Sequence, residues 1–187
     1  MNIVGIAGSL RKGSFNKALL QAAVTSMPTG HTLHLASIDD VPLYHGDEET
    51  AHGTPPSVAR LRAEIAAAHG LLLVTPEYNG SIPGVFKNAM DWISRPAKDN
   101  LKVFDDKPVA VMGATPGMGG TRLAQAAWLP VLRNLGTHPW CGKQLYVSNA
   151  SHVFDAEGTL IDAKVKLLLG EFMAGFTTFV SAMSQQS

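Results

Sequence analysis

Apolar and polar positions along the chain follow two periods in turn, and this alternation predicts strands and helices. Short runs with the composition of buried strands occur at five places. They are Ile3–Ala7, Thr32–Ala36, Leu71–Thr75 and Pro108–Gly113, with Thr137–Trp140 and Leu145–Val147 as candidate pieces of a fifth strand and its extension.

Longer segments between these runs place apolar residues three and four positions apart, which is the spacing of one helix face. Pro130 is expected to kink the fourth of these helices or divide it near Leu129, because proline lacks a backbone N–H. Residues 39–56 are rich in Gly, Pro and Asp and are expected to form a long loop. The helices are expected from Phe15 to about Met27 and over Val58–Ala68, Val85–Ile93, Leu123–Leu135 and Ile161–Met183.

Five strands alternating with five helices predict a doubly wound α/β fold, in which right-handed crossovers build one parallel five-stranded sheet. The chain shows no internal repeat and no linker, so a single domain is expected over residues 1–187. The dinucleotide fingerprint Gly-x-Gly-x-x-Gly is absent, because Gly5-Ile6-Ala7-Gly8 has the wrong spacing. The strand order 2-1-3-4-5 is therefore favoured.

Composition argues against several classes of partner. The 15 basic and 15 acidic residues give a formal net charge of zero, and no cluster of Lys and Arg favours nucleic acid. No signal peptide is expected, and no apolar segment is expected to have the length that spans a bilayer. The single cysteine, Cys141, excludes an internal disulfide and suits the cytoplasm. The spacing of the seven histidines predicts no metal site.

The strongest candidate for chemistry is the turn Gly8-Ser9-Leu10-Arg11-Lys12-Gly13-Ser14-Phe15-Asn16, which joins the first strand to the first helix. Unpaired N–H groups and the positive end of the helix dipole make such a turn an anion site. Its glycines let the backbone approach an anion, and its Ser and Asn side chains offer neutral hydrogen bonds. Arg11 adds a charge-assisted bond. Ser14-Phe15 replaces the Lys-Ser/Thr of a P-loop, so one phosphate fits better than two or three.

Each residue of this turn also has an ordinary structural explanation. Ser14 is suited to cap the helix, Arg11 to lie in solvent, and the glycines to shape the turn. The occurrence of all nine residues together, between a strand and a helix, favours the anion site.

Two further loops, residues 76–83 and 114–120, are expected to leave the same edge of the sheet. Both are rich in Gly and Pro and low in charge, and Tyr78 is their one aromatic residue. Such walls can hold a flat heteroaromatic ring through backbone groups. A phosphate beside a planar ring describes a mononucleotide, most simply FMN. No nucleophile with its base and no acid–base pair is evident, so the cofactor is expected to supply the chemistry.

These loops resemble a known family. The nine-residue turn, the loop Pro-Glu-Tyr-Asn-Gly-Ser-Ile-Pro-Gly and the segment Lys87–Trp92 are similar to the NADPH-dependent FMN reductases, in the branch of bacterial chromate and quinone reductases. The resemblance covers essentially the whole chain. It implies a flavodoxin-like fold and two-electron transfer from NADPH or NADH, through N5 of bound FMN, to quinones, free flavin, azo compounds or chromate. It also implies a homodimer or homotetramer, in which a partner subunit forms one wall of each flavin site.

The resemblance further implies which residues surround FMN. Gly80 departs from the pattern, because relatives often carry Tyr at that position, and Pro130 is also unusual; substrate range and tetramer contacts are therefore not carried over. The phosphate would lie among Ser9, Arg11, Ser14, Phe15 and Asn16. The ring would lie against Pro76, Glu77, Tyr78, Asn79 and Gly80, closed by Thr115, Pro116, Gly117 and Gly119.

Two other functions stay open at this point. The first is a one-electron carrier of the flavodoxin type, against which the zero net charge argues, because such carriers tend to be acidic for docking. The second is a flavin-binding module without turnover. The sequence also leaves open the electron acceptor and the choice between NADPH and NADH.

Overall fold

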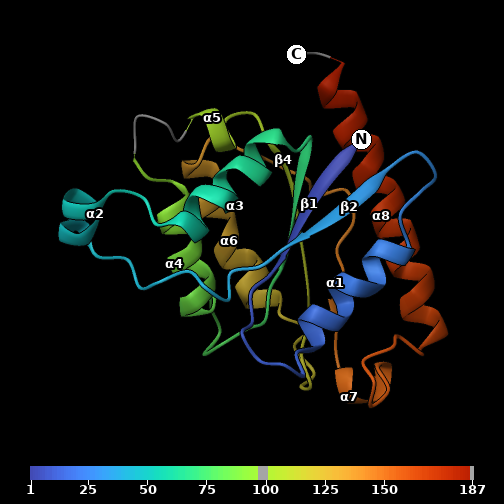
Figure 1. Cartoon of the computed structure of the whole chain (residues 1–187). Helices are drawn as coiled ribbons and strands as arrows, with labels where there is room; N and C mark the ends of the chain where they lie inside the picture. The colour runs from blue at the N-terminus through green and yellow to red at the C-terminus, as the bar shows by residue number, and fades with distance from the viewer. Residues whose placement is uncertain (97–100, 186–187) are drawn as a thin grey trace.

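A parallel sheet lies at the centre of the computed structural model, which describes residues 1–96 and 101–185 (Figure 1). Its order, β2-β1-β3-β4-β5, confirms the prediction. The fifth position is shared by two short strands, because β6 also pairs with β4. The strands are β1 (Asn2–Ala7), β2 (Thr32–Ala36), β3 (Gly70–Val74), β4 (Pro108–Ala114), β5 (His138–Pro139) and β6 (Tyr146–Val147).

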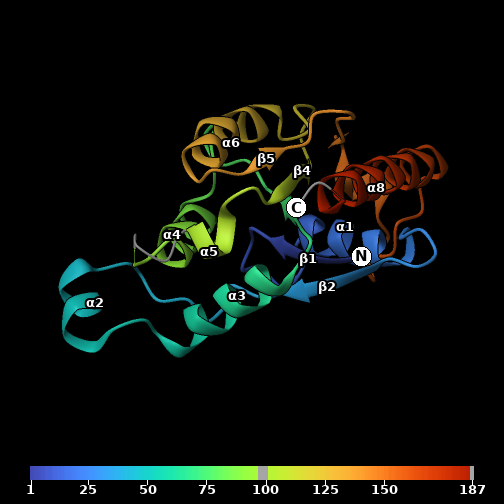
Figure 2. The same ribbon diagram turned by 90° about the horizontal axis from the view of Figure 1, so that it is seen from above.

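Helices cover both faces of the sheet, with α1 and α8 on one face and α3, α4 and α6 on the other (Figure 2). Successive strand residues point to opposite faces, so Leu72 of β3 packs in the core under α1 and α8 while Leu71 and Leu73 pack in the other core. The helices are α1 (Phe15–Thr25), α2 (Gly46–His52), α3 (Pro56–Ala67), α4 (Gly84–Ile93), α5 (Leu101–Phe104), α6 (Arg122–Asn134), α7 (Ala150–Val153) and α8 (Ala163–Ser184).

The expectation that residues 39–56 form only a loop is wrong, because α2 lies within this segment. Its helical signal is capping rather than apolar periodicity. His45 accepts a hydrogen bond from the backbone N–H of Asp47, and Asp47, Glu48 and Glu49 place negative charge in the first turn, where the helix dipole favours it. None of the residues of α2 is buried, and the helix projects from the body of the molecule (Figure 1).

Pro130 does not divide α6, which runs unbroken from Arg122 to Asn134. A proline in a helix removes one backbone hydrogen bond, a loss that tertiary packing can offset. Trp128 and Leu132 lie on either side of the proline and are fully buried in the core, so packing holds both halves of the helix in place.

The expectation that no apolar segment has the length to span a bilayer is also wrong. The 22-residue helix α8, with a mean hydropathy of 1.3, is long and apolar enough by length and composition alone. The fold supplies another reason for this composition, because Leu169, Phe172 and Phe176 are buried against the sheet. The helix begins at Ala163 rather than Ile161, because Asp162 caps it by accepting from the Val165 N–H at 2.8 Å.

Candidate functional site

Three loops leave the carboxyl ends of β1, β3 and β4, which are neighbours in the sheet, and they line one cavity of about 70 Å³. A cavity of this size can hold a few water molecules or one small group, and not a whole nucleotide. Ala114 contributes to the lining although the sequence did not predict it, and Asn79, Gly80, Gly117 and Gly119 lie outside it. The predicted residues that line it are Ser9, Arg11, Ser14, Phe15, Asn16, Pro76, Glu77, Tyr78, Thr115 and Pro116.

The N-terminus of α1 provides the hydrogen-bond donors on one side of this cavity. The Ser14 hydroxyl oxygen accepts from the N–H groups of Asn16 and Lys17 at 3.2 and 3.3 Å, so Ser14 is the N-cap, as its structural explanation proposed. The Ser14 proton remains available as a donor. The N–H groups of Gly13, Ser14 and Phe15 make no hydrogen bond within residues 1–96 and 101–185. Capping and anion binding are therefore compatible here.

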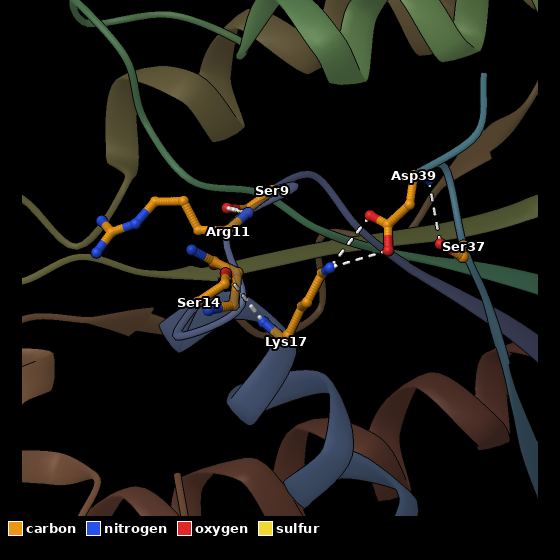
Figure 3. A network of polar contacts seen from close by, with 7 residues as sticks. Ser9, Arg11, Ser14, Lys17, Ser37 and Asp39 are labelled. Atoms are coloured by element: carbon orange, nitrogen blue, oxygen red, sulfur yellow. Dashed lines mark hydrogen bonds and ion pairs between the residues drawn. The ribbon is translucent and has the colours of Figure 1, made fainter. Parts of the chain in front are cut away.

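Two cations near the turn point in different directions (Figure 3). Lys17 Nζ contacts both oxygens of the Asp39 carboxylate, at 3.1 and 3.2 Å. The Arg11 side chain extends away from that pair, lines the cavity and forms no ion pair with the described part of the chain. Arg11 is thus free to meet an anion in the cavity, whereas Lys12, the other cation of the turn, does not line it.

Asn16 has a structural role that the sequence did not indicate. Its side-chain amide donates to the Ala114 carbonyl at 2.9 Å, and its carbonyl accepts from the Ala114 N–H at 2.8 Å. Both bonds are buried. Asn16 therefore fixes the first turn of α1 to the end of β4, which holds the first and third loops together.

Gly8 has a packing role that the sequence did not indicate. A Cβ atom at this position would lie 2.0 Å from the ring of Phe86, a fully buried residue of α4. The glycine is therefore needed for packing between the end of β1 and α4. Gly13, by contrast, has open space around it.

The second loop ends in a tight hairpin turn at Tyr78-Asn79-Gly80-Ser81. Tyr78 and Ser81 exchange two backbone hydrogen bonds of 3.2 and 3.1 Å, and Asn79 and Gly80 have φ angles of 52° and 72°. Two positive φ angles define a type I′ turn, which Asn-Gly favours. The turn leaves Tyr78 46% exposed beside the cavity.

Glu77 makes a side-chain contact that sequence reasoning missed. One carboxylate oxygen accepts from the backbone N–H groups of Leu123 and Ala124, at 2.8 and 3.0 Å. Those groups belong to the first turn of α6, where Thr121 at the N-cap position has a φ of 64° and makes no side-chain cap. The second loop is therefore bonded to the helix that follows the third loop. The only sequence signal was that Glu77 is the one carboxylate in these loops.

The third loop is held by the segment that follows β6. Thr115 donates its N–H to Val147 at 2.9 Å and accepts from Ala150 at 3.0 Å, and the Gly117 carbonyl accepts from Asn149 at 2.9 Å. These backbone bonds fix the loop without charged side chains, so its surface beside the cavity stays nearly neutral.

The carboxylates that follow β2 pair with cations. Asp39 meets Lys17, and Asp40 meets Arg60 at 3.0 Å. The hydrogen bond from Arg60 lowers the pKa of Asp40. Within residues 1–96 and 101–185, no three His, Cys, Asp or Glu side chains gather closely enough to hold a metal ion.

A doubly wound sheet of order 2-1-3-4-5, with an anion cradle and two nearly neutral loops at its carboxyl edge, defines the class of this protein. It is a flavodoxin-like α/β protein. In such sheets, ligands bind beyond the carboxyl ends of the strands, where the strand order reverses; here that point lies between β1 and β3.

Comparison with known proteins identifies the family. The sequence model of the NADPH-dependent FMN reductases matches residues 1–152. An NAD(P)H-dependent FMN reductase of Pseudomonas aeruginosa is 42% identical over 96% of this chain and 95% of its own length. A 2-hydroxy-1,4-benzoquinone reductase of a Burkholderia species is 36% identical over 96% of each chain. The solved structure of FerB, a flavoenzyme NAD(P)H:(acceptor) oxidoreductase from Paracoccus denitrificans, has a TM-score of 0.86 at 33% identity, covering 97% of this chain and 98% of that one. The chain belongs to the NADPH-dependent FMN reductase family.

Family membership confirms the expected enzyme class, an oxidoreductase that uses FMN and NAD(P)H. The donor set at the cavity fits the phosphate end of FMN, which carries a single phosphate. Free N–H groups at a helix N-terminus, a hydroxyl proton and an unpaired guanidinium are suitable partners for such an anion.

Proposed function

We propose that the protein is an FMN-dependent reductase that passes two electrons from NAD(P)H to a quinone or to free flavin. Azo compounds and chromate are further acceptors of the same two-electron chemistry. The observation that carries the proposal is the joint lining of one cavity by the α1 N-terminus and by two nearly neutral loops. The relatives named for FMN and benzoquinone reduction support the choice of acceptors.

The first loop would hold the phosphate. The N–H groups of Gly13, Ser14 and Phe15 and the Ser14 hydroxyl donate neutral hydrogen bonds, and Arg11 donates a charge-assisted one. Ser9 stabilises the turn by accepting from the Arg11 N–H at 3.4 Å. Asn16 bonds the backbone of Ala114 and thereby holds the N-terminus of α1 beside the third loop.

The second and third loops would bind the ring, through residues 76–80 and 115–119. Bound FMN would supply the redox chemistry, which is acceptance of a hydride at N5 and transfer of two electrons to the acceptor. The chain contributes orientation and polarity: the N–H groups of Asn79 and Gly80 have no partner in the described residues and can stabilise negative charge on the ring. No side chain of these loops needs to gain or lose a proton.

Exposed apolar side chains on the three loops and at the start of α6 form what we call the rim of the site. The rim suits a planar acceptor or nicotinamide and a second copy of the chain, so we place the protein in a homodimer or homotetramer. The single cysteine, Cys141, supports placing it in the cytoplasm. Gly80 leaves one side of the rim without a side chain. The exposed apolar residues of the rim are Leu10, Tyr78, Met118 and Leu123.

The test is the visible spectrum of the purified protein and its response to NADPH. We expect a yellow protein whose flavin absorption bleaches with NADPH and returns when a quinone is added, with continued NADPH oxidation. Assays without quinone and without protein are the controls. Colourless protein that does not bind added FMN would end the proposal. A stable neutral semiquinone without NADPH turnover would indicate a one-electron carrier instead.

A further inference from the structure

A helix follows each of the three loops at this edge of the sheet, and α4, after the second loop, begins behind Pro83 without a side-chain cap. The N-termini of α1 and α6 differ more sharply, because that of α1 is open and that of α6 is occupied by a carboxylate. At α1, three backbone N–H groups have no partner among the residues that the structure describes. At α6, the Glu77 carboxylate from another loop occupies the N–H groups of Leu123 and Ala124. An unfilled N-terminus of α6 would be a second place for a phosphate.

We propose that Glu77 is a positioning residue for the flavin, an inference that rests on the proposed function. Its carboxylate closes the α6 N-terminus and ties the ring-binding turn Tyr78–Ser81 to the start of α6. The phosphate is thereby directed to α1, and the ring is directed to the two loops that Glu77 joins.

The position of Glu77 in the chain supports this role. It lies between Pro76, which follows β3, and the type I′ turn at Asn79 and Gly80. The turn is closed by its own Tyr78–Ser81 bonds, which fix its shape but not its place relative to the third loop. The two bonds from Glu77 to α6 supply that placement, at 2.8 and 3.0 Å.

Charge gives Glu77 a second effect. A carboxylate at a helix N-terminus is stabilised by the dipole, and it cancels the positive potential that the helix would otherwise direct at the site. Glu77 lines the same cavity as Ser14 and Arg11, so its negative charge lies close to the bound cofactor. This charge disfavours the extra negative charge of reduced flavin and therefore lowers the flavin midpoint potential.

Two substitutions separate the positioning effect of Glu77 from the effect of its negative charge. Glu77→Gln retains a carbonyl oxygen that can accept from Leu123 and Ala124 but has no charge, whereas Glu77→Ala has neither. We expect Glu77→Ala to raise the FMN Kd about tenfold, and Glu77→Gln to keep it within about threefold. Both variants should have a more positive flavin midpoint potential than the unsubstituted protein.

Asp162→Ala is the matched control, because Asp162 caps α8 through the Val165 N–H in the same way. We expect it to lower Tm without changing the FMN Kd or the potential. The inference is overturned if Glu77→Ala, like Asp162→Ala, changes neither the FMN Kd nor the flavin midpoint potential. It is also overturned if Glu77→Gln raises the FMN Kd as much as Glu77→Ala does. An unsubstituted protein that binds no FMN would instead reject the proposed function, so the two failures are distinguishable.

Discussion

The N-termini of α1 and α6 present the same kind of backbone N–H groups, but a carboxylate from another loop occupies only the N-terminus of α6. Each helix begins just after a loop at the carboxyl edge of the sheet, and the first N–H groups of each helix have no partner within the helix. Ser14 caps α1 from within its own turn, and the N–H groups of Gly13, Ser14 and Phe15 meet no acceptor in residues 1–96 and 101–185. At α6 a carboxylate from a different loop takes the corresponding place.

The difference teaches that a helix dipole alone does not define an anion site. A neutral hydroxyl cap satisfies two N–H groups and adds no charge, so the positive end of α1 still attracts an anion. A carboxylate cap satisfies its N–H groups and also cancels the local potential. The nature of the cap therefore decides which helix can hold the phosphate.

The strongest test of this comparison is a variant in which a carboxylate caps α1, as one caps α6. Ser14→Asp preserves an excellent N-cap, so Tm should change little. The new carboxylate would lie beside the phosphate, and like charges about 4 Å apart near a protein surface cost about 4 kcal/mol. We expect FMN affinity to fall by about that amount, measured by fluorescence titration.

Ser14→Ala is the companion variant, because it removes the cap without adding charge. It should lower stability by about 1 kcal/mol and weaken FMN far less than Ser14→Asp. If Ser14→Asp binds FMN as tightly as the unsubstituted protein, the phosphate does not lie at α1.

The next largest effect is expected at Asn16, which holds the N-terminus of α1 at a fixed place relative to the third loop. Asn16→Ala leaves the buried N–H and carbonyl of Ala114 unpaired, at about 1–3 kcal/mol for each group. We expect a loss of about 3 kcal/mol in the free energy of unfolding, measured in urea, with a weaker FMN complex as a consequence.

Asn88 offers a matched control for this loss. Its amide bonds the backbone N–H of Tyr44 and the carbonyl of Pro42 in the same pattern, in a more exposed place. Asn88→Ala should cost less stability, because water can replace the lost bonds, and should leave FMN binding unchanged. Equal effects of the two variants on FMN would show that Asn16 has no special connection with the site.

The fold was predictable because its signals are local. Leu71-Leu72-Leu73-Val74 indicates a strand covered on both faces, and all five residues of β3 are buried. The nine-residue turn after β1 likewise predicted a helix start, and Ser14 caps it. Local signals also placed the three loops at one edge, since the carboxyl ends of neighbouring parallel strands meet there.

The contacts that complete the site were not predictable, because they join residues far apart in the chain. Glu77 meets Leu123 and Ala124 only because Thr121 adopts a left-handed conformation and leaves the α6 cap open. Asn16 meets Ala114 only once β4 lies near β1 in the sheet. The packing role of Gly8 was missed for the same reason, since its neighbour Phe86 comes from α4.

A smaller effect on FMN binding than that of Ser14→Asp is expected at Arg11. It sharpens the comparison because the arginine at the start of α6, Arg122, lies instead over the Tyr146 ring, 5.2 Å from its centroid. Arg11 extends into the cavity region without an ion-pair partner in the described residues, whereas Lys17 is held by Asp39 (Figure 3). Arg11→Ala should weaken FMN binding by about 2 kcal/mol, the size of one charge-assisted hydrogen bond.

Arg11→Lys keeps the charge but loses the planar two-pronged donor, so it should recover only part of this affinity. Arg133→Ala, at the opposite end of α6, is the control for a change in net charge alone and should bind FMN normally. The decisive measurement is the salt dependence of FMN binding, because a charge contact weakens as salt screens it. If Arg11→Ala and the unsubstituted protein show the same affinity and the same salt dependence, the α1 turn holds the phosphate without Arg11.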